Sequence, residues 1–226
     1  MISWIAFSGV IGIADGCHIR ISKPSFEKDP LQQEKFFNRK GYYSWNALGV
    51  IDDTLRFIYF SCKYPGNAHD SRVYNESRLK AKLEETYDEN APRHLIGDKG
   101  YQLQKTMLIP VREDQVITQA QKDFIRMFIK LRIKVEHAFG ILKKFFPALL
   151  YGLRKDKVLN SQATVFAAVV LYNMARDFNE PEPILPQDMT IGQFDQLVRD
   201  STINQACRLQ DRDKQIRNLI IDTYFS

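Results

Sequence analysis

The chain has 226 residues, of which 44% are hydrophobic and 26% charged, with a net charge of +5, as in a globular protein with one ordinary core and an appendage. The apolar stretch at residues 163–175 is too short to cross a bilayer, so no membrane role is expected. Three widely spaced cysteines without a C-x-x-C pair argue against a disulfide framework and against a zinc site.

The first half of the chain alternates apolar runs with turn residues, which predicts strands followed by a helix. The expected elements are a strand at 10–14, a loop at 22–41, hairpin strands at 45–51 and 56–63, and a helix from 70 to about 90. We interpret Asp52 and Asp53 as turn residues of the hairpin rather than as ligands, because aspartate side chains readily accept bonds from nearby backbone amides.

The second half of the chain is dominated by helical patterns. The expected elements are strands at 94–97 and 107–111, helices at 118–146 and 161–178, and an acidic, helical tail at 179–226. In the 118–146 segment apolar residues recur at helical spacing, which predicts a core-facing stripe, and Pro147 is expected to stop the helix.

This order of elements predicts an α/β fold in which helices flank a mixed sheet. We assign that fold to residues 9–178 and treat residues 179–226 as a C-terminal helical appendage. Residues 119–158 contain ten lysines and arginines against three acids, a net charge of +7, whereas residues 177–226 carry −4. The basic segment suits a polyanion-binding surface, and a solvated helix face is the alternative.

Four acidic residues interrupt or close segments that otherwise have the pattern of buried chain: Asp15, Asp70, Asp98 and Glu136. A carboxylate at the edge of a hydrophobic core is costly unless it is paired or binds a metal ion. Clustered carboxylate oxygens are the ligands that Mg²⁺ and Mn²⁺ prefer, whereas zinc favours histidine and cysteine. Two such cations can cut a phosphodiester bond, so the pattern indicates a metal-dependent site of that kind.

Five ordered motifs resemble the DDE domain of PIF/Harbinger-type transposases and the nucleases derived from them. They lie within residues 12–19, 37–46, 64–74, 95–101 and 132–143, and the likeness extends over about residues 9–175. Thirty-seven residues separate Asp98 from Glu136, in keeping with the spacing in that family.

The resemblance implies a ribonuclease-H-like fold and a DNA endonuclease that uses Mg²⁺ or Mn²⁺. Asp15, Asp98 and Glu136 would be the catalytic metal ligands, and Asp70 a further metal ligand, with a helix cap as the alternative for Asp70. An ordinary helix salt bridge with Arg132 is the alternative for Glu136.

The basic residues near these motifs are candidates for DNA contacts, with loop or helix solvation as the alternative. They are Arg39, Lys40, Arg132, Lys143 and Lys144. Family transposases bind DNA through an upstream helix-turn-helix region or a Myb-like partner protein, and no such region precedes residue 9 in this sequence. The resemblance implies DNA as the substrate and a nuclear location, and either a truncated gene product or a source of specificity elsewhere, such as a Myb-like partner. The alternative function is an inactive, co-opted domain that binds DNA or a protein without cutting.

Overall fold

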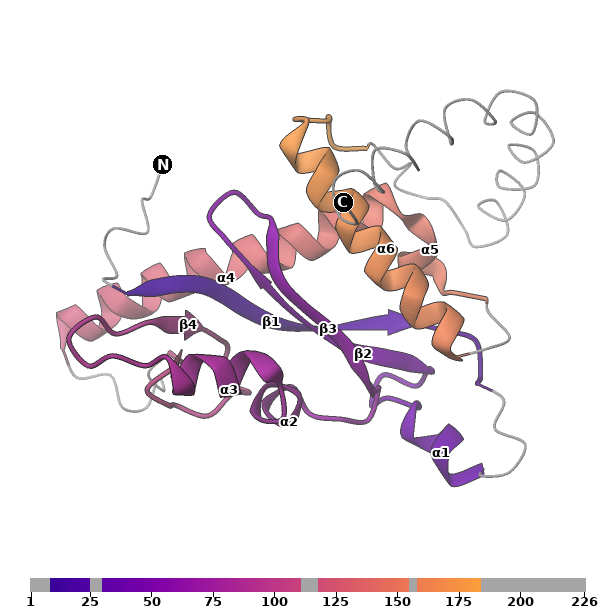
Figure 1. The fold of residues 1–226 in the computed structure, drawn as a ribbon, viewed down its shortest axis with the longest axis horizontal. Coiled ribbons are helices and arrows are strands. Elements are labelled where there is room, and N and C mark those ends of the chain that lie inside the picture. Colours follow the sequence, from indigo (N-terminus) through magenta and orange to yellow (C-terminus); the bar gives the residue numbers. More distant parts are fainter. Residues whose placement is uncertain (1–8, 25–29, 111–117, 155–157, 184–226) are drawn as a thin grey trace. The chain divides into compact units, whose positions relative to one another are not determined.

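The computed structural model describes residues 9–24, 30–110, 118–154 and 158–183, which form a five-stranded sheet with helices on both faces (Figure 1). The strands are β1 (Val10–Arg20), β2 (Ser44–Ile51), β3 (Phe57–Pro65), β4 (His94–Ile96) and β5 (Met107–Leu108). The helices are α1 (Pro30–Lys35), α2 (Asp70–Asn75), α3 (Arg78–Glu85), α4 (Gln119–Phe145), α5 (Pro147–Tyr151) and α6 (Val158–Asp177). The predicted α/β class with a mixed sheet is confirmed.

The sheet has the strand order β3-β2-β1-β4-β5, so β1 lies at its centre. β1 pairs antiparallel with β2, and β2 pairs antiparallel with β3, as the hairpin pattern predicted. β1 pairs in parallel with β4, and β4 in parallel with β5. The last paired positions of β1 and β4 are Ile13 and Ile96, so the chain after β4 leaves the sheet beside the middle of β1.

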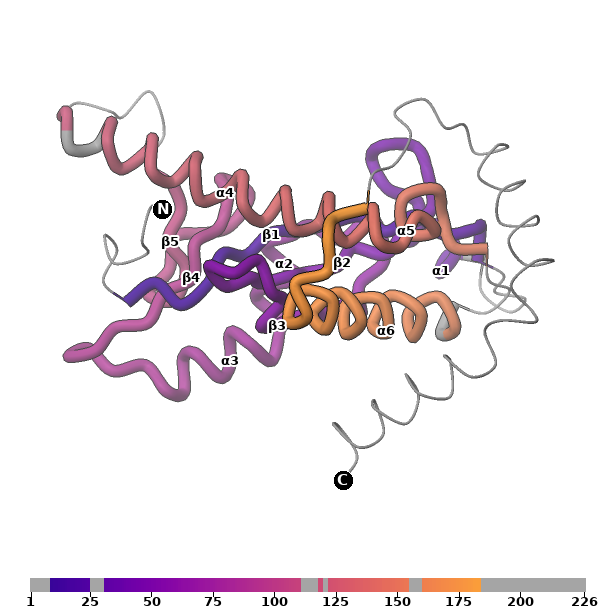
Figure 2. Tube along the Cα trace, turned by 90° about the horizontal axis from the view of Figure 1, so that it is seen from above, coloured from indigo at the N-terminus to yellow at the C-terminus, as the bar shows by residue number. Residues whose placement is uncertain are grey.

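Two hydrophobic cores lie on opposite faces of the sheet. On one face, α4, α5 and α6 pack against residues such as Ile13 and Ile19 of β1. On the other face, α2 and α3 pack against Ala14 and the strand residues that share its orientation. α6 lies beside α4 in both views of the chain (Figures 1 and 2). The period-2 alternation of β1 therefore decides which helices each of its side chains meets.

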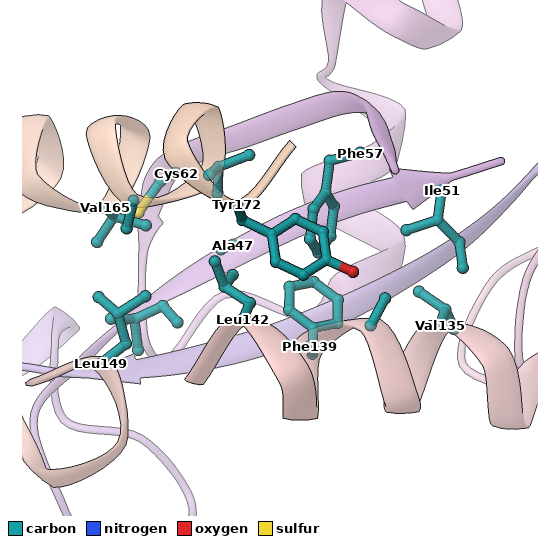
Figure 3. Close-up of a cluster of buried hydrophobic side chains, with 14 of the residues drawn as sticks. Ala47, Ile51, Phe57, Cys62, Val135, Phe139, Leu142, Leu149, Val165 and Tyr172 are labelled. Atoms are coloured by element: carbon teal, nitrogen blue, oxygen red, sulfur yellow. The ribbon is translucent and has the colours of Figure 1, made fainter. Parts of the chain in front are cut away.

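Aromatic rings join α4, α6 and the hairpin in the larger core (Figure 3). The Phe57 ring lies 5.1 Å from that of Phe139 and 5.4 Å from that of Tyr172, measured between centroids. The Tyr172 hydroxyl donates a 2.8 Å hydrogen bond to the Leu55 carbonyl. Asn173 accepts from the Phe57 amide and donates to its carbonyl, both at 2.9 Å. The C-terminal half of α6 is thus fixed to the start of β3.

The structure differs from several of the predicted elements. β1 runs to Arg20 rather than ending near Ala14, because β2 pairs with it from Ile13 to Arg20, so Asp15 lies within the strand and not at its end. The helix predicted from residue 70 is broken into α2 and α3, where the Ser77 side chain caps α3 by accepting from the Lys80 amide. The sequence pattern also missed two short helices, α1 and α5.

The hairpin turn has the predicted chemistry. The carboxylate of Asp52 accepts hydrogen bonds from the Thr54 amide and hydroxyl and from the Arg56 amide. The predicted tail falls mainly on residues 184–226, outside the described part of the chain, so its helical character and the boundary at residue 178 stay predictions. Among the described helices, none has the length and apolar character needed to cross a membrane.

Candidate active site

Asp15 lies in β1, and Asp98 lies two residues after the end of the neighbouring parallel strand β4, close enough for its charge to act on Asp15. Each follows its paired isoleucine, Ile13 in β1 and Ile96 in β4, by two residues. Ile13 and Ile96 belong to the core under α4, and the alternation of a strand gives Asp15 the same orientation as Ile13. The Asp98 carboxylate is held by the backbone amide of Gly100, which donates to it at 2.7 Å. β4, the strand before Asp98, is thus the direct neighbour of β1, the strand that contains Asp15.

The Asp15 carboxyl group is in an unfavourable electrostatic environment. Burial raises its pKa from 3.8 to about 7, and the negative charges of Asp98 and Asp70 act in the same direction. A hydrogen bond from the Gly16 amide and the positive charge of Arg132 oppose the shift without cancelling it. A buried, crowded carboxylate of this kind is expected where a cation binds, because the cation supplies the missing positive charge.

Asp70 reaches the same neighbourhood from the opposite face of the sheet. It is the first residue of α2, and the N-cap position belongs to His69, so the predicted alternative of a capping role for Asp70 is wrong. Its carboxylate accepts a 2.7 Å hydrogen bond from the Asn46 side-chain amide and lies directly against the Cα of Gly16. The negative charge of Asp70 therefore acts on Asp15 from the other face of the sheet. Its carboxylate fits there because Gly16 has no Cβ.

Gly16→Ala is expected to displace Asp70, because the added Cβ would overlap its carboxylate. Overpacking of this kind costs about 1–3 kcal/mol of unfolding free energy. The control is Gly140→Ala in α4, where a Cβ meets no atom within 4 Å and the helix gains about 1 kcal/mol from alanine. Urea unfolding of both variants measures the difference, and equal midpoints would show that Asp70 does not rest on Gly16.

Glu136 lies on α4, the helix that packs against β1, but its side chain is paired along the helix. Its carboxylate is 2.9 Å from the Arg132 guanidinium, and both side chains are about half exposed, at 50% and 49%. Arg132 in turn contributes its charge to Asp15. Arg132 therefore forms an ion pair with Glu136, the predicted third ligand, and its positive charge also acts to lower the pKa of Asp15. As they stand, no three His, Cys, Asp or Glu side chains of the described residues form a group that could hold a metal ion.

A polar cavity of about 470 Å³ opens beside Asp98 and Asp70. His18, Arg39, Asn67 and His69 also line it. Arg39 thus lines the same cavity as Asp70 and Asp98, and its role as a DNA contact stays a prediction.

Other predicted DNA contacts gather around the end of β1. Burial lowers the pKa of His18, and the nearby charges of Lys40, Arg39 and Lys143 lower it further, whereas Asp70 acts against them. The Lys143 ammonium group is 3.4 Å from the His18 carbonyl oxygen. Lys144 instead lies 3.9 Å from the carboxylate of Glu182, on another side of α4. The structure therefore assembles three of the five predicted basic residues near one end of β1, while Arg132 lies by the carboxylates.

Sequence reasoning missed two buried polar residues of this region. Burial raises the pKa of Tyr101 well above its ordinary value, and the charges of Asp70, Asp15 and Asp98 add to the effect. Within the described residues the Tyr101 hydroxyl has no hydrogen-bond partner. Asn46 is 1% exposed and positions Asp70. A polar residue within the otherwise apolar strand was the available signal for Asn46, whereas nothing local distinguished Tyr101 from a core tyrosine.

Comparison with known proteins gives the family of this chain. The sequence profile of the DDE superfamily endonuclease family matches residues 14–173. A protein of Bos taurus named "Putative nuclease HARBI1" is 29% identical over 169 residues, which cover 74% of this chain and 46% of that protein. The Homo sapiens protein of the same name is 28% identical over the same shares, and the Mus musculus protein is 31% identical over 46% of this chain and 28% of its own length.

The chain spans less than half the length of these relatives. No solved structure shows significant similarity to it. The match to the family profile begins just before Asp15 and covers Asp70, Asp98 and Glu136, and it confirms the resemblance drawn from the five motifs. The chain is therefore a member of the DDE superfamily endonuclease family.

Proposed function

We propose that this protein is a divalent-metal-dependent DNA endonuclease that hydrolyses phosphodiester bonds. The observation that carries the proposal is the closeness of Asp98, which follows β4, to Asp15 in the adjacent parallel strand β1, where burial and the charge of Asp98 raise the pKa of Asp15. Family membership supports the same reaction class. The strand order β3-β2-β1-β4-β5, with three antiparallel strands followed by two parallel ones, supports a ribonuclease-H-like version of the mixed fold.

The donor set fits Mg²⁺ or Mn²⁺. All four predicted ligands present carboxylate oxygens, which hard cations prefer. The raised pKa of Asp15 supports this fit, since burial and two neighbouring acids leave its charge undercompensated. A divalent cation bound there would activate water at neutral pH and stabilise the charge that develops on the phosphate.

Different residues of the chain would bind the cation and the DNA phosphates. Asp15 and Asp98 would hold the cation from the sheet, and the Gly100 amide keeps the Asp98 carboxylate in place. Glu136 would complete the set from α4, one helical turn beyond its present partner Arg132. Asp70, held by Asn46, would either bind the cation or add to the negative potential that attracts it. The cations Arg39, Lys40 and Lys143 would hold the phosphates of the bound strand.

Plasmid nicking tests the proposal most directly. Asp98→Asn keeps an oxygen for the Gly100 amide but lowers affinity for a divalent cation, so we expect nicking with Mn²⁺ to fall on the order of a thousandfold. The matched control is Asp53→Asn, which makes the same charge change in the exposed hairpin turn. The control should cut at the parent rate, and both variants should keep the parent circular dichroism spectrum.

Equal nicking by the parent and Asp98→Asn, with metal present, would reject this active site. A parent protein that binds DNA in EDTA, with strong salt dependence but without metal-induced cutting, would instead support the inactive, co-opted domain. The two outcomes separate cutting from binding because the second is measured without any divalent cation.

A further inference from the structure

A second cavity, of about 230 Å³, lies on the α4 side of Asp98. Asp98 lines both this cavity and the polar one of about 470 Å³. Asp98, a proposed catalytic residue, therefore borders both cavities. A DNA strand bound at Asp98 would place different parts of its nucleotides in the two cavities.

The walls of the smaller cavity combine two kinds of group. Pro110, Ile125, Phe128 and Ile129 form an apolar surface, with Phe128 buried and Ile129 54% exposed. Lys99 and Arg132 bring positive charge to the same cavity. By contrast, the polar cavity has Arg39, two histidines and Asn67 on its walls. The smaller cavity thus suits a flat apolar group attached to an anion, and the larger one suits the sugar–phosphate chain.

We propose that the smaller cavity takes one unpaired base of the DNA strand whose phosphate lies at Asp98, an inference that rests on the proposed function. The base would pack against Pro110 and Ile129, while Lys99 and Arg132 attract its phosphate. A paired base is stacked within the duplex and cannot enter such a hollow, so the protein favours DNA with an unpaired nucleotide. Lys99 and Arg132, which is also paired with Glu136, are two cations against the single carboxylate of Asp98 on these walls, and this charge favours a nucleotide over an apolar peptide.

The test compares binding of two DNA probes in buffer with Ca²⁺. One is a fluorescent duplex with a single bulged thymidine, and the other carries an abasic residue at the bulged position. We expect the full-length parent to bind the bulged thymidine about tenfold more tightly in fluorescence anisotropy, the effect of losing one base contact.

Variants on α4 supply the matched control. Ile129→Ser replaces an exposed wall residue and should remove the preference for the base while leaving binding of the abasic probe unchanged. Ile133→Ser makes the same change one turn further along α4, at a residue 56% exposed that does not line the cavity, and should keep the preference.

Equal binding of both probes by the parent, absence of binding to either, or an undiminished preference in Ile129→Ser would each overturn the inference. The readout is independent of cutting, so its failure and that of the proposed function can be told apart. If the protein nicks plasmid but binds both probes equally, the proposed function stands and the base pocket is rejected. If the protein prefers the bulged base but does not cut DNA, the base pocket stands and the nuclease function is rejected.

Discussion

Asp15→Asn is expected to stabilise the metal-free protein at pH 8 and at the same time to abolish its response to divalent cations. In the parent, burial and the charges of Asp98 and Asp70 raise the pKa of Asp15 to about 7, against 3.8 for an ordinary aspartate. Between these pH values the folded protein keeps a proton that the unfolded chain has lost. Raising the pH through this window therefore lowers the stability of the metal-free parent.

Asparagine removes that loss, because its side chain carries no charge at any pH in the window. We expect a gain on the order of 2 kcal/mol at pH 8 in EDTA, shrinking to nothing below about pH 4, where both side chains are neutral. Mn²⁺ should stabilise the parent and leave Asp15→Asn almost unchanged, because the variant lacks the carboxylate that a cation compensates. Nicking should fall on the order of a thousandfold in the same variant.

Thermal and urea unfolding between pH 4 and pH 8, each with EDTA or Mn²⁺, measure both effects. Asp53→Asn in the exposed hairpin turn is the control and should follow the parent in every condition. An Asp15→Asn protein that is less stable than the parent at pH 8 in EDTA would contradict the electrostatic account. One that still gains stability from Mn²⁺ would place the metal elsewhere.

Phe139→Ala is expected to cost about 3–5 kcal/mol of unfolding free energy, the range for a phenylalanine removed from a packed core. Phe139 is 4% exposed and packs its ring against Phe57. A Cβ on Gly49 would come within 2.6 Å of the Phe139 ring, which shows how closely α4 approaches the sheet there. The cavity left by alanine would loosen the helix that also carries Glu136.

The control for this substitution is Ile133→Ala on the same helix. Its side chain is 56% exposed, so the change in stability should stay within about 0.5 kcal/mol. Phe139→Leu should lie between the two, because it keeps most of the apolar volume. Urea unfolding distinguishes the three, and equal midpoints for Phe139→Ala and Ile133→Ala would mean that α4 is not packed through this face.

Local sequence patterns predicted most of the elements, but they placed Asp15 after the end of the first strand, whereas it lies within β1. The glycine and apolar residues around Val10 indicated a strand, and the period-2 pattern correctly gave the hairpin. The pattern could not show that β1 continues to Arg20, because Asp15, Gly16 and His18 interrupt the apolar run and pairing with β2 keeps this part extended. Asp15 is therefore a strand residue under α4, and its perturbed pKa follows from that burial.

The sequence by itself determined the α/β class, the positions of the four acids and, through five motifs, the family. Those properties depend on local periodicity and on residue identity along the chain, which are visible in one dimension. Only the tertiary structure decided that Asp98 lies close to Asp15, that Asp70 packs against Gly16, and that the charge of Arg132 acts on Asp15. Strand order and helix packing set these distances, and both arise from contacts between residues far apart in the chain.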